Sequence, residues 1–310
     1  MRTIGQPAEL PTEGRPVALA IGVFDGVHVG HREVISRMVD AVREQDAIAV
    51  VATFDRHPNA IVAPAHTPPA IQSTAQRLRA FADLGAEATW LIRFDEAFSR
   101  QTGEEFVRGL VSGFGRVATV CVGSTFRFGY RRQGDVALLQ RLGRELGFET
   151  VGVEPLTLEG ETVSSTRLRE QIRAGLLAQA GRLLGRPYAL AGPVLKGDGL
   201  GRQLGFPTAN LDVNGLVLPP NGVYAARTSW AARRFVAVMN IGVRPTVRAA
   251  PGPLRAEVHL LDLQTDRDLY GEELIVTPVT RLRDEQRFPS LDALKAQIAR
   301  DADAARRVLS

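Results

Sequence analysis

The fold of the first half of the chain is decided by the stretch GVFDGVHVGH, residues Gly22 to His31. It follows an apolar run, Val17 to Ile21, and it precedes a helical stripe of apolar residues within residues 31 to 45. The glycines and histidines therefore fall in a turn from a strand to a helix. Glycine can take backbone angles that a Cβ would forbid, and a helix N-terminus attracts anions through its unpaired N–H groups. The stretch therefore predicts a phosphate site.

Other sites with glycine or histidine fit this stretch less well. Two of the five histidines lie here, but a zinc site needs about four ligands, and the only cysteine, Cys121, lies in an apolar, strand-like run. A P-loop is excluded because it requires Gly-Lys-Ser/Thr, and the only lysines are Lys196 and Lys295. A glycine turn beside unrelated surface histidines stays open on this stretch alone.

The composition predicts a globular protein with more than one domain. The 310 residues are enough for two domains, and 45% of them are hydrophobic and 23% charged. We expect a cytoplasmic protein without a membrane partner, because no apolar run reaches about 20 residues and the N-terminus lacks a secretion signal. The single cysteine permits no internal disulfide, which agrees with a reducing compartment.

The charge favours small anionic ligands over nucleic acid. The net charge is +4 and the pI is about 9.7. However, the arginines are spread along the chain and aromatic residues are few, so neither a clustered basic face nor a stacking platform is present. We therefore expect small-molecule partners and no nucleic acid.

The rest of the first half alternates between strand and helix patterns. An irregular lead-in up to Pro16 and a loop over residues 59 to 70 interrupt it. Alternation of this kind predicts a doubly wound parallel sheet, with ligands at the carboxyl edge of its strands. At that edge we expect the turn Phe54 to Pro58 and the glycine-bounded turn Gly123 to Gly129. Phe54, Asp55 and His57 are candidates for the pocket wall, and Asp55 as a helix or turn cap stays open as the alternative. The expected strands are 47–54, 89–94 and 117–122, and the expected helices are 31–45, 75–84 and 103–112.

Three hydroxyl residues, Ser164, Ser165 and Thr166, precede Arg167 at the start of a further helical pattern. Serine and threonine at a helix start are usually caps. Hydroxyls followed by arginine also make a good anion cradle, because the guanidinium forks onto phosphate. Both interpretations stay open for this segment.

The pattern changes near Leu184 to Pro187, where helical periodicity gives way to short runs with period two. Short strands without intervening helices predict an antiparallel β-barrel, and a helix over residues 290 to 308 follows it. We therefore predict two domains, 1–185 and 186–310. The expected strands of the second are 188–195, 223–228, 235–240, 255–261 and 273–279.

Three stretches of the second half are too specific for turns of a barrel. A glycine-rich loop, Lys196 to Asn210, ends with Thr208 and Asn210 two residues apart, which suits one Mg²⁺ ion held by oxygen ligands or an ordinary turn. Glu257 interrupts an apolar strand, either as a solvent-facing residue or as a functional carboxylate. The polar segment Arg283 to Pro289 leads into the last helix.

Taken together, Gly22 to His31 and Ser164 to Arg167 resemble the nucleotidyltransferase superfamily, whose His-x-Gly-His turn and Ser/Thr-rich second motif bind ATP phosphates. The stretches of the second half resemble riboflavin kinase, as do Gly222 to Tyr224, Asn240 to Thr246 and Asp268 to Gly271. In this order they resemble the bacterial bifunctional riboflavin kinase/FMN adenylyltransferases, also called FAD synthetases, over essentially the whole chain.

The resemblance implies two reactions on one flavin. The barrel phosphorylates riboflavin with ATP and Mg²⁺ to give FMN, and the first domain adenylylates FMN to FAD. It implies catalytic roles for Glu257, His28, His31, Ser164 and Arg167. It also implies that ATP in the first domain is bound by Gly22, Phe24, Asp25, Gly26, Gly30, Gly123, Ser165 and Thr166. By the same resemblance, ATP in the barrel is bound by Gly197, Gly199, Gly201, Gly205, Pro207, Thr208 and Asn210, of which Thr208 and Asn210 also bind Mg²⁺. The residues that the resemblance implies for flavin binding are Arg283, Glu285, Arg287 and Phe288.

The chain departs from the family pattern at two positions. Arg56 stands where the family usually has proline, and Thr125 where it usually has Asp or Asn. No role is transferred to either. The alternative function is a single-activity adenylyltransferase for another phosphorylated precursor, with a barrel that only binds.

Overall fold

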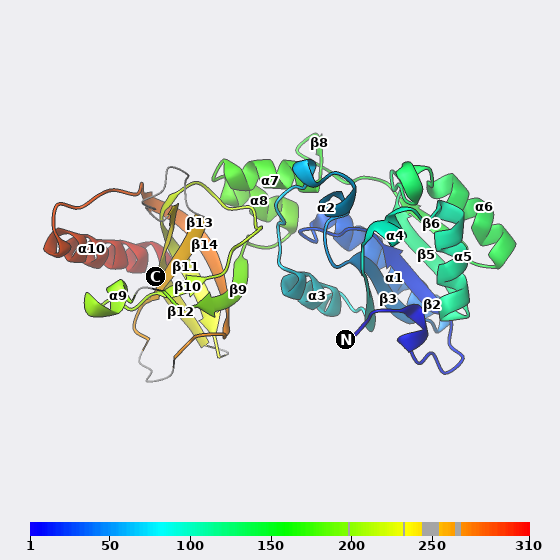
Figure 1. Cartoon of the computed structure of the whole chain (residues 1–310), viewed down its shortest axis with the longest axis horizontal. Coiled ribbons are helices and arrows are strands. Elements are labelled where there is room, and N and C mark those ends of the chain that lie inside the picture. The colour runs from blue at the N-terminus through cyan, green and yellow to red at the C-terminus, as the bar shows by residue number, and fades with distance from the viewer. Residues whose placement is uncertain (198, 232, 244–253, 264–267) are drawn as a thin grey trace. The chain divides into compact units, whose positions relative to one another are not determined.

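In the computed structural model the chain forms two compact units, Met1–Ser165 and Thr166–Ser310 (Figure 1). The structure describes residues 1–197, 199–231, 233–243, 254–263 and 268–310. Two of the predicted motif stretches, the glycine loop at Asp198 and residues 244 to 246, lie partly outside this range. The predicted domain boundary after residue 185 lies beyond helices α7 (Ser165–Arg173) and α8 (Leu177–Leu184), and it stays a prediction.

The first unit is built on a six-stranded sheet whose paired strands are all parallel, in the order β1-β4-β3-β2-β5-β6. This confirms the predicted doubly wound sheet. The strands are β1 (Arg2–Ile4), β2 (Val17–Ile21), β3 (Ile48–Phe54), β4 (Ala88–Ile92), β5 (Val117–Gly123) and β6 (Glu149–Val153).

Helices cover both faces of this sheet, because its central strand is apolar on both sides. Leu19 packs in one core cluster with Phe106 of α5 (Gly103–Phe114) and Leu139 of α6 (Val136–Leu146). Ala20 packs in another with Met38 of α1 (Val29–Gln45) and Phe81 of α3 (Thr74–Asp83). All five residues of β2 are buried, as expected for a central parallel strand.

Several elements of the first unit differ from the prediction. The lead-in contains β1, a three-residue edge strand that buries only Ile4, so its sequence carries no periodic signal. The predicted loop 59–70 contains α2 (Asn59–Val62) and a 3₁₀ turn at Pro64–His66, where proline stands at the first helical position. Helix α4 (Glu96–Ser99), α6, β6 and the hairpin of β7 (Thr157–Leu158) and β8 (Glu161–Thr162) were not predicted.

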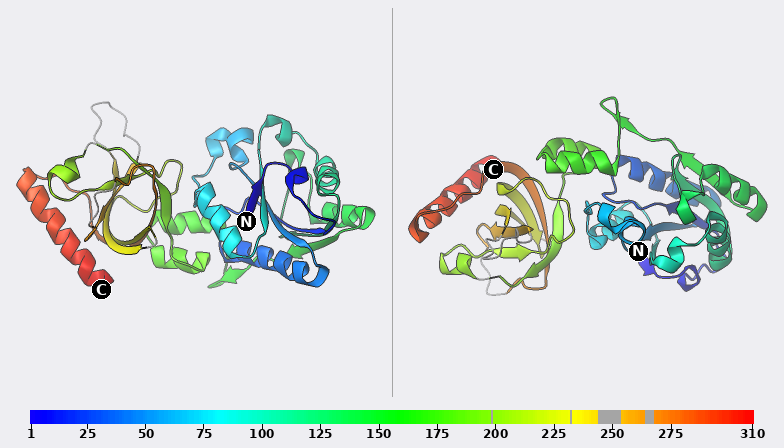
Figure 2. Two further views of the ribbon diagram at one scale, coloured as in Figure 1. Left: turned by 90° about the horizontal axis from the view of Figure 1, so that it is seen from below. Right: turned by 45° about the horizontal axis from the view of Figure 1, so that its top comes forward.

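The second unit is a closed antiparallel barrel in the order β10-β13-β12-β11-β14-β9, which confirms the predicted architecture (Figure 2). Inside it lie alternate residues such as Ala256, Val258 and Leu260. Its strands are β9 (Leu190–Leu195), β10 (Ala209–Leu211), β11 (Gly222–Trp230), β12 (Arg233–Val243), β13 (Leu254–Leu260) and β14 (Glu273–Arg283).

The last helix, α10 (Leu291–Leu309), packs on the outside of the barrel. Its residues Ala302, Ala305 and Leu309 form a core cluster with Val223 of β11 and Val238 of β12. Within the described residues, no helix is both long enough and apolar enough to cross a membrane.

Candidate functional sites

The first unit has a cavity of about 290 Å³ at the carboxyl edge of its sheet. Strands β3 and β5 flank β2 on opposite sides, so the chain reverses its direction of winding here, which is where open α/β sheets bind ligands. The wall comes from the turns after β2 and β5, from Val153 at the end of β6, and from residues 154 to 156 that follow it. The predicted residues that line it are Gly22, Phe24, His28, Gly30, His31, Gly123, Ser164 and Ser165. The structure thus brings the two predicted phosphate motifs together.

The glycines of the signature turn serve two different purposes. Gly26 has a φ of +90°, as predicted for a turn that a side chain would strain. For Gly22 and Gly30 the predicted need for such angles is wrong, since neither has a left-handed φ. At both positions space is short: a Cβ on Gly22 would lie 2.9 Å from the Phe24 ring, which would have to shift, and one on Gly30 would lie 3.3 Å from the His28 ring, a tight contact.

The two histidines form one unit at the N-terminus of α1. The backbone N–H of His31 donates to Nδ1 of His28 at 3.2 Å, which makes His28 the N-cap, and the ring centroids stack 3.5 Å apart. Burial, and then the proximity of His28, hold the pKa of His31 well below its usual value. His31 is therefore neutral near pH 7. Its Nδ1 is buried without a hydrogen-bond partner among the described residues.

Asp25 has a structural contact that the sequence did not indicate. Its carboxylate accepts hydrogen bonds from the backbone N–H groups of Ile71 at 2.9 Å and Gln72 at 3.4 Å, and its side chain is not part of the cavity wall. The hydroxyl of Ser165 donates to the Asp25 carbonyl at 2.9 Å, which ties the second motif to the first. Thr166 and Arg167 belong to the second unit. The ATP-binding roles of Asp25, Gly26 and Thr166 and the catalytic role of Arg167 stay predictions, and none of the four lines the cavity.

The three candidates for the pocket wall, Phe54, Asp55 and His57, do not line this cavity, and Asp55 instead has the role of the alternative, closing a turn. Asp55 accepts the backbone N–H of Phe94 at 3.0 Å and pairs with Arg56 at 2.9 Å, while His57 accepts the N–H of Asn59. Their polar groups close a turn. Of the two departures from the family pattern, Thr125 lines the cavity.

Arg77 of α3 is a residue behind this site that the sequence analysis missed. Its buried guanidinium donates to the carbonyls of Val23 at 3.0 Å and Phe54 at 2.9 Å, the residues where β2 and β3 lead into their turns. A buried arginine that binds two strand ends fixes their spacing. Nothing in its helical sequence context distinguishes it from a surface arginine.

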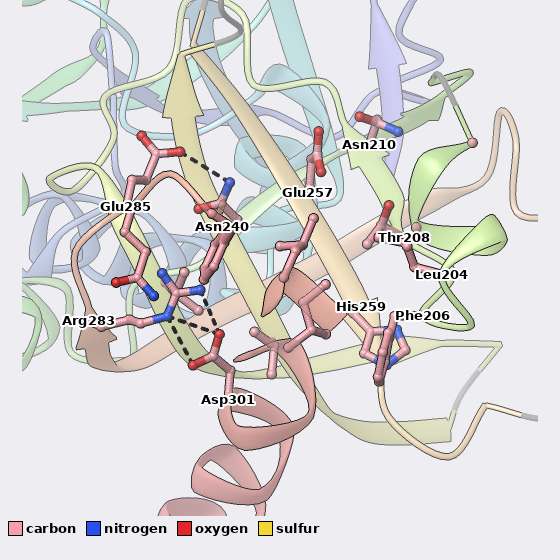
Figure 3. A pocket seen from close by; sticks show the side chains of 18 residues that line it. Leu204, Phe206, Thr208, Asn210, Asn240, Glu257, His259, Arg283, Glu285 and Asp301 are labelled. Atoms are coloured by element: carbon pink, nitrogen blue, oxygen red, sulfur yellow. Dashed lines mark hydrogen bonds and ion pairs between the residues drawn. The ribbon is translucent and has the colours of Figure 1, made fainter. Parts of the chain in front are cut away.

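The second unit has a cavity of about 390 Å³ on the outer face of the barrel, between the glycine loop, the strands and α10 (Figure 3). Its size falls within the usual range for small-molecule sites. The predicted residues in its wall are Gly199, Gly201, Thr208, Asn210, Glu257, Arg283, Glu285 and Phe288. Gly197, Gly205, Pro207 and Arg287 are not in the wall, and Arg287 is exposed.

Strand register aligns the polar floor of this cavity. Asn210 of β10 is paired with Glu257 of β13, which is paired with Asn240 of β12. Asn240 is paired with Val223 of β11, which is paired with Arg283 of β14. We call these five residues the register row. All five line the cavity, so the prediction that Glu257 lies on the face opposite Val258 is confirmed.

The glycine loop needs its glycines for both conformation and space. Gly199 and Gly205 have φ values of +73° and +85°. A Cβ on Gly197 would clash with the Asn210 amide, and one on Gly201 would clash with the Phe206 carbonyl. The loop also contains one helical turn, α9 (Leu200–Gln203), which the sequence analysis did not predict.

An ion pair fixes the segment that follows β14. The Arg283 guanidinium donates to both carboxylate oxygens of Asp301 on α10, at 2.7 to 3.1 Å (Figure 3). It also lies 5.7 Å from the centre of the Phe288 ring. Glu285 accepts from the Asn240 amide at 3.3 Å. Asn240, His259 and Asp301 are wall residues to which the sequence analysis gave no role.

Asp301→Asn is expected to lower the free energy of unfolding of the barrel by about 2 kcal/mol. The substitution weakens a forked, charge-assisted pair and leaves the partly buried Arg283 guanidinium without an opposite charge. Urea unfolding followed by Trp230 fluorescence, in a Trp90→Phe background, measures this. The matched control is Asp303→Asn on the same helix, whose pair with Arg306 is exposed and is expected to contribute little. Equal effects of the two variants would contradict the prediction.

Comparison with known proteins gives matches over the whole chain. Residues 10–167 match the family model for FAD synthetase, and residues 184–309 match the model for riboflavin kinase. The bifunctional riboflavin kinase/FMN adenylyltransferase of Escherichia coli K12 is 39% identical over 99% of this chain and 96% of its own. The protein with that description from Pseudomonas fluorescens is 39% identical over 96% of this chain and 94% of its own.

A solved structure also matches both units. It is titled as a macrolide-efflux protein from Streptococcus pneumoniae, with a TM-score of 0.81 and 29% identity over 98% of both chains.

Proposed function

The chain belongs to the family of bifunctional riboflavin kinase/FMN adenylyltransferases, and from this premise we propose which residues carry each of its two reactions. The barrel phosphorylates riboflavin with ATP to give FMN, and the parallel-sheet unit transfers the adenylyl group of ATP to FMN to give FAD. The observation that supports the assignment of residues is that each unit has its own cavity, lined by its own predicted motif.

In the kinase reaction Glu257 acts as the general base. The 5′-hydroxyl of riboflavin has no acidity of its own near pH 7, so its proton must be accepted as its oxygen attacks the γ-phosphorus of ATP and ADP leaves. Glu257 lies in the register row between two asparagines, Asn210 and Asn240, and its side chain lines the cavity. The glycine loop covers the nucleotide, and the segment from Arg283 to Phe288 covers the flavin.

Mg²⁺ is proposed for the same cavity. Thr208 and Asn210 both line it and supply oxygen donors, the ligand type that Mg²⁺ prefers. No group of three or more His, Cys, Asp or Glu residues within the described ranges could hold a metal ion, but Mg²⁺ bound to ATP needs only one or two protein ligands besides phosphate. When bound, the ion neutralises phosphate charge.

The adenylyltransferase reaction needs no base. The phosphate of FMN is already an anion, so its oxygen attacks the α-phosphorus of ATP directly and pyrophosphate leaves. Catalysis is therefore positioning and stabilisation of charge. We assign these to His28 and His31 at the N-terminus of α1 and to Ser164 in the second motif, all of which line the cavity. The catalytic role that the resemblance implies for Arg167, which does not line it, stays a prediction. The hydroxyl of Ser165 holds the two motifs together through Asp25.

Product analysis with riboflavin as the only flavin tests this function. With ATP and Mg²⁺ present, chromatography is expected to show FMN first and FAD later. One ADP is released for each FMN formed and one pyrophosphate for each FAD. A single-activity adenylyltransferase would form no FMN, and a flavin-binding protein would release neither ADP nor pyrophosphate. On composition we also propose that the enzyme works in the cytoplasm without a nucleic-acid or membrane partner.

A further inference from the structure

His259 is a wall residue of the kinase cavity that the proposed mechanism does not use. It lies two residues after Glu257 on β13, so both side chains project from the same face of the strand. Its Nδ1 lies 2.8 Å from the carbonyl oxygen of Pro207, which is 52 positions earlier in the sequence. A carbonyl oxygen only accepts hydrogen bonds, so Nδ1 carries the proton and donates.

Two contacts of the imidazole hold consecutive residues of the glycine loop. Besides the bond to Pro207, the His259 ring meets the Phe206 ring edge to face, with centroids 5.5 Å apart and an interplanar angle of 85° (Figure 3). The next residue is Thr208. Burial lowers the pKa of His259, which keeps the ring neutral near pH 7.

Thr208 depends on these contacts for its position. It lies just before β10, so the ladder from Ala209 to Leu211 does not include it. The Pro207 carbonyl belongs to the peptide plane that enters Thr208, and the proline ring fixes the preceding φ. Fixing that carbonyl therefore sets the direction in which the Thr208 hydroxyl enters the cavity.

We propose that His259 is a positioning residue for the kinase reaction: its Nδ1–H holds the Pro207 carbonyl and thereby places Thr208 against the phosphates of ATP. The proposal rests on the role given above to Thr208. It concerns the affinity for ATP rather than the proton transfer, because the imidazole is bound to the loop and Glu257 is the base.

Three substitutions in the full chain separate the donor from the ring. His259→Asn keeps an N–H at the place of Nδ1, whereas His259→Gln carries the same amide one carbon further out. His259→Phe keeps the ring and removes the donor. Riboflavin phosphorylation is measured over a range of MgATP concentrations, and conversion of FMN to FAD by the other unit of each variant serves as the control.

We expect KM for ATP to rise about tenfold in His259→Phe and His259→Gln, with kcat changed less than KM, and to stay within about twofold of wild type in His259→Asn. If His259→Phe does not fold, the KM values for ATP of His259→Asn and His259→Gln still test whether the donor at Nδ1 is needed. Unchanged KM in both Phe and Gln variants, or equal impairment of Asn and Gln, would overturn the proposal. Either result would contradict the role of His259 but not the proposed kinase activity. That activity would be contradicted by wild-type protein that forms no FMN.

Discussion

Replacing Glu257 with glutamine is expected to slow FMN formation from riboflavin by roughly 100- to 10,000-fold, while supplied FMN is still converted to FAD at the wild-type rate. Glutamine has the same shape and can keep hydrogen bonds to its neighbours, but it cannot accept the proton of the riboflavin hydroxyl. The two rates are measured on the same preparation, one with riboflavin and one with FMN as substrate.

The matched control is Glu272→Gln, an exposed carboxylate just before β14, which should leave both rates unchanged. A Glu257→Gln variant that phosphorylates riboflavin normally would remove Glu257 from the mechanism. Loss of both reactions would contradict the division of work between the two units.

His31→Ala is expected to have the opposite effect, with FAD formation slowed roughly 100-fold or more and FMN accumulating. The substitution removes a neutral imidazole that is stacked on His28 at the cavity wall, and with it a donor for the charge that develops on the phosphates. The readouts are flavin products by chromatography and release of pyrophosphate.

His66→Ala provides the comparison, because His66 is exposed and lies in a 3₁₀ turn outside the cavity. An unchanged rate of FAD formation in His31→Ala would show that the stacked pair serves only to cap α1. A fall in FMN formation as well would show that the substitution acts through global stability.

The sequence predicted best what is encoded locally. The strand, turn and helix around Gly22 to His31 were predicted because an apolar run, three glycines and a helical stripe follow one another without a gap. The first strand was missed because pairing with β4, and not its own pattern, makes it a strand. The Arg283 contact with Asp301 was missed because it joins residues 18 apart in different elements.

The candidate sites were predicted where a motif is contiguous and missed where the fold assembles them. Thr208, Asn210 and Glu257 were named from their own segments and line one cavity, and Asn240 joins them through strand pairing. His259 was missed although it lies two residues after Glu257, where the period of two in the strand places it on the same face. Arg287 was named with its neighbours but does not line the cavity, because the pattern of a short polar segment does not indicate which of its residues face inward.

Because the register row depends on strand pairing, the kinase cavity is sensitive to the number of residues within each strand. Deleting one residue within β13 ahead of Glu257 would turn every later side chain of that strand to the other face, exchanging a carboxylate for an aliphatic group in the floor. Insertions in the turns between strands leave this alternation intact. The floor of the cavity therefore depends on the spacing of residues inside the strands as much as on their identity.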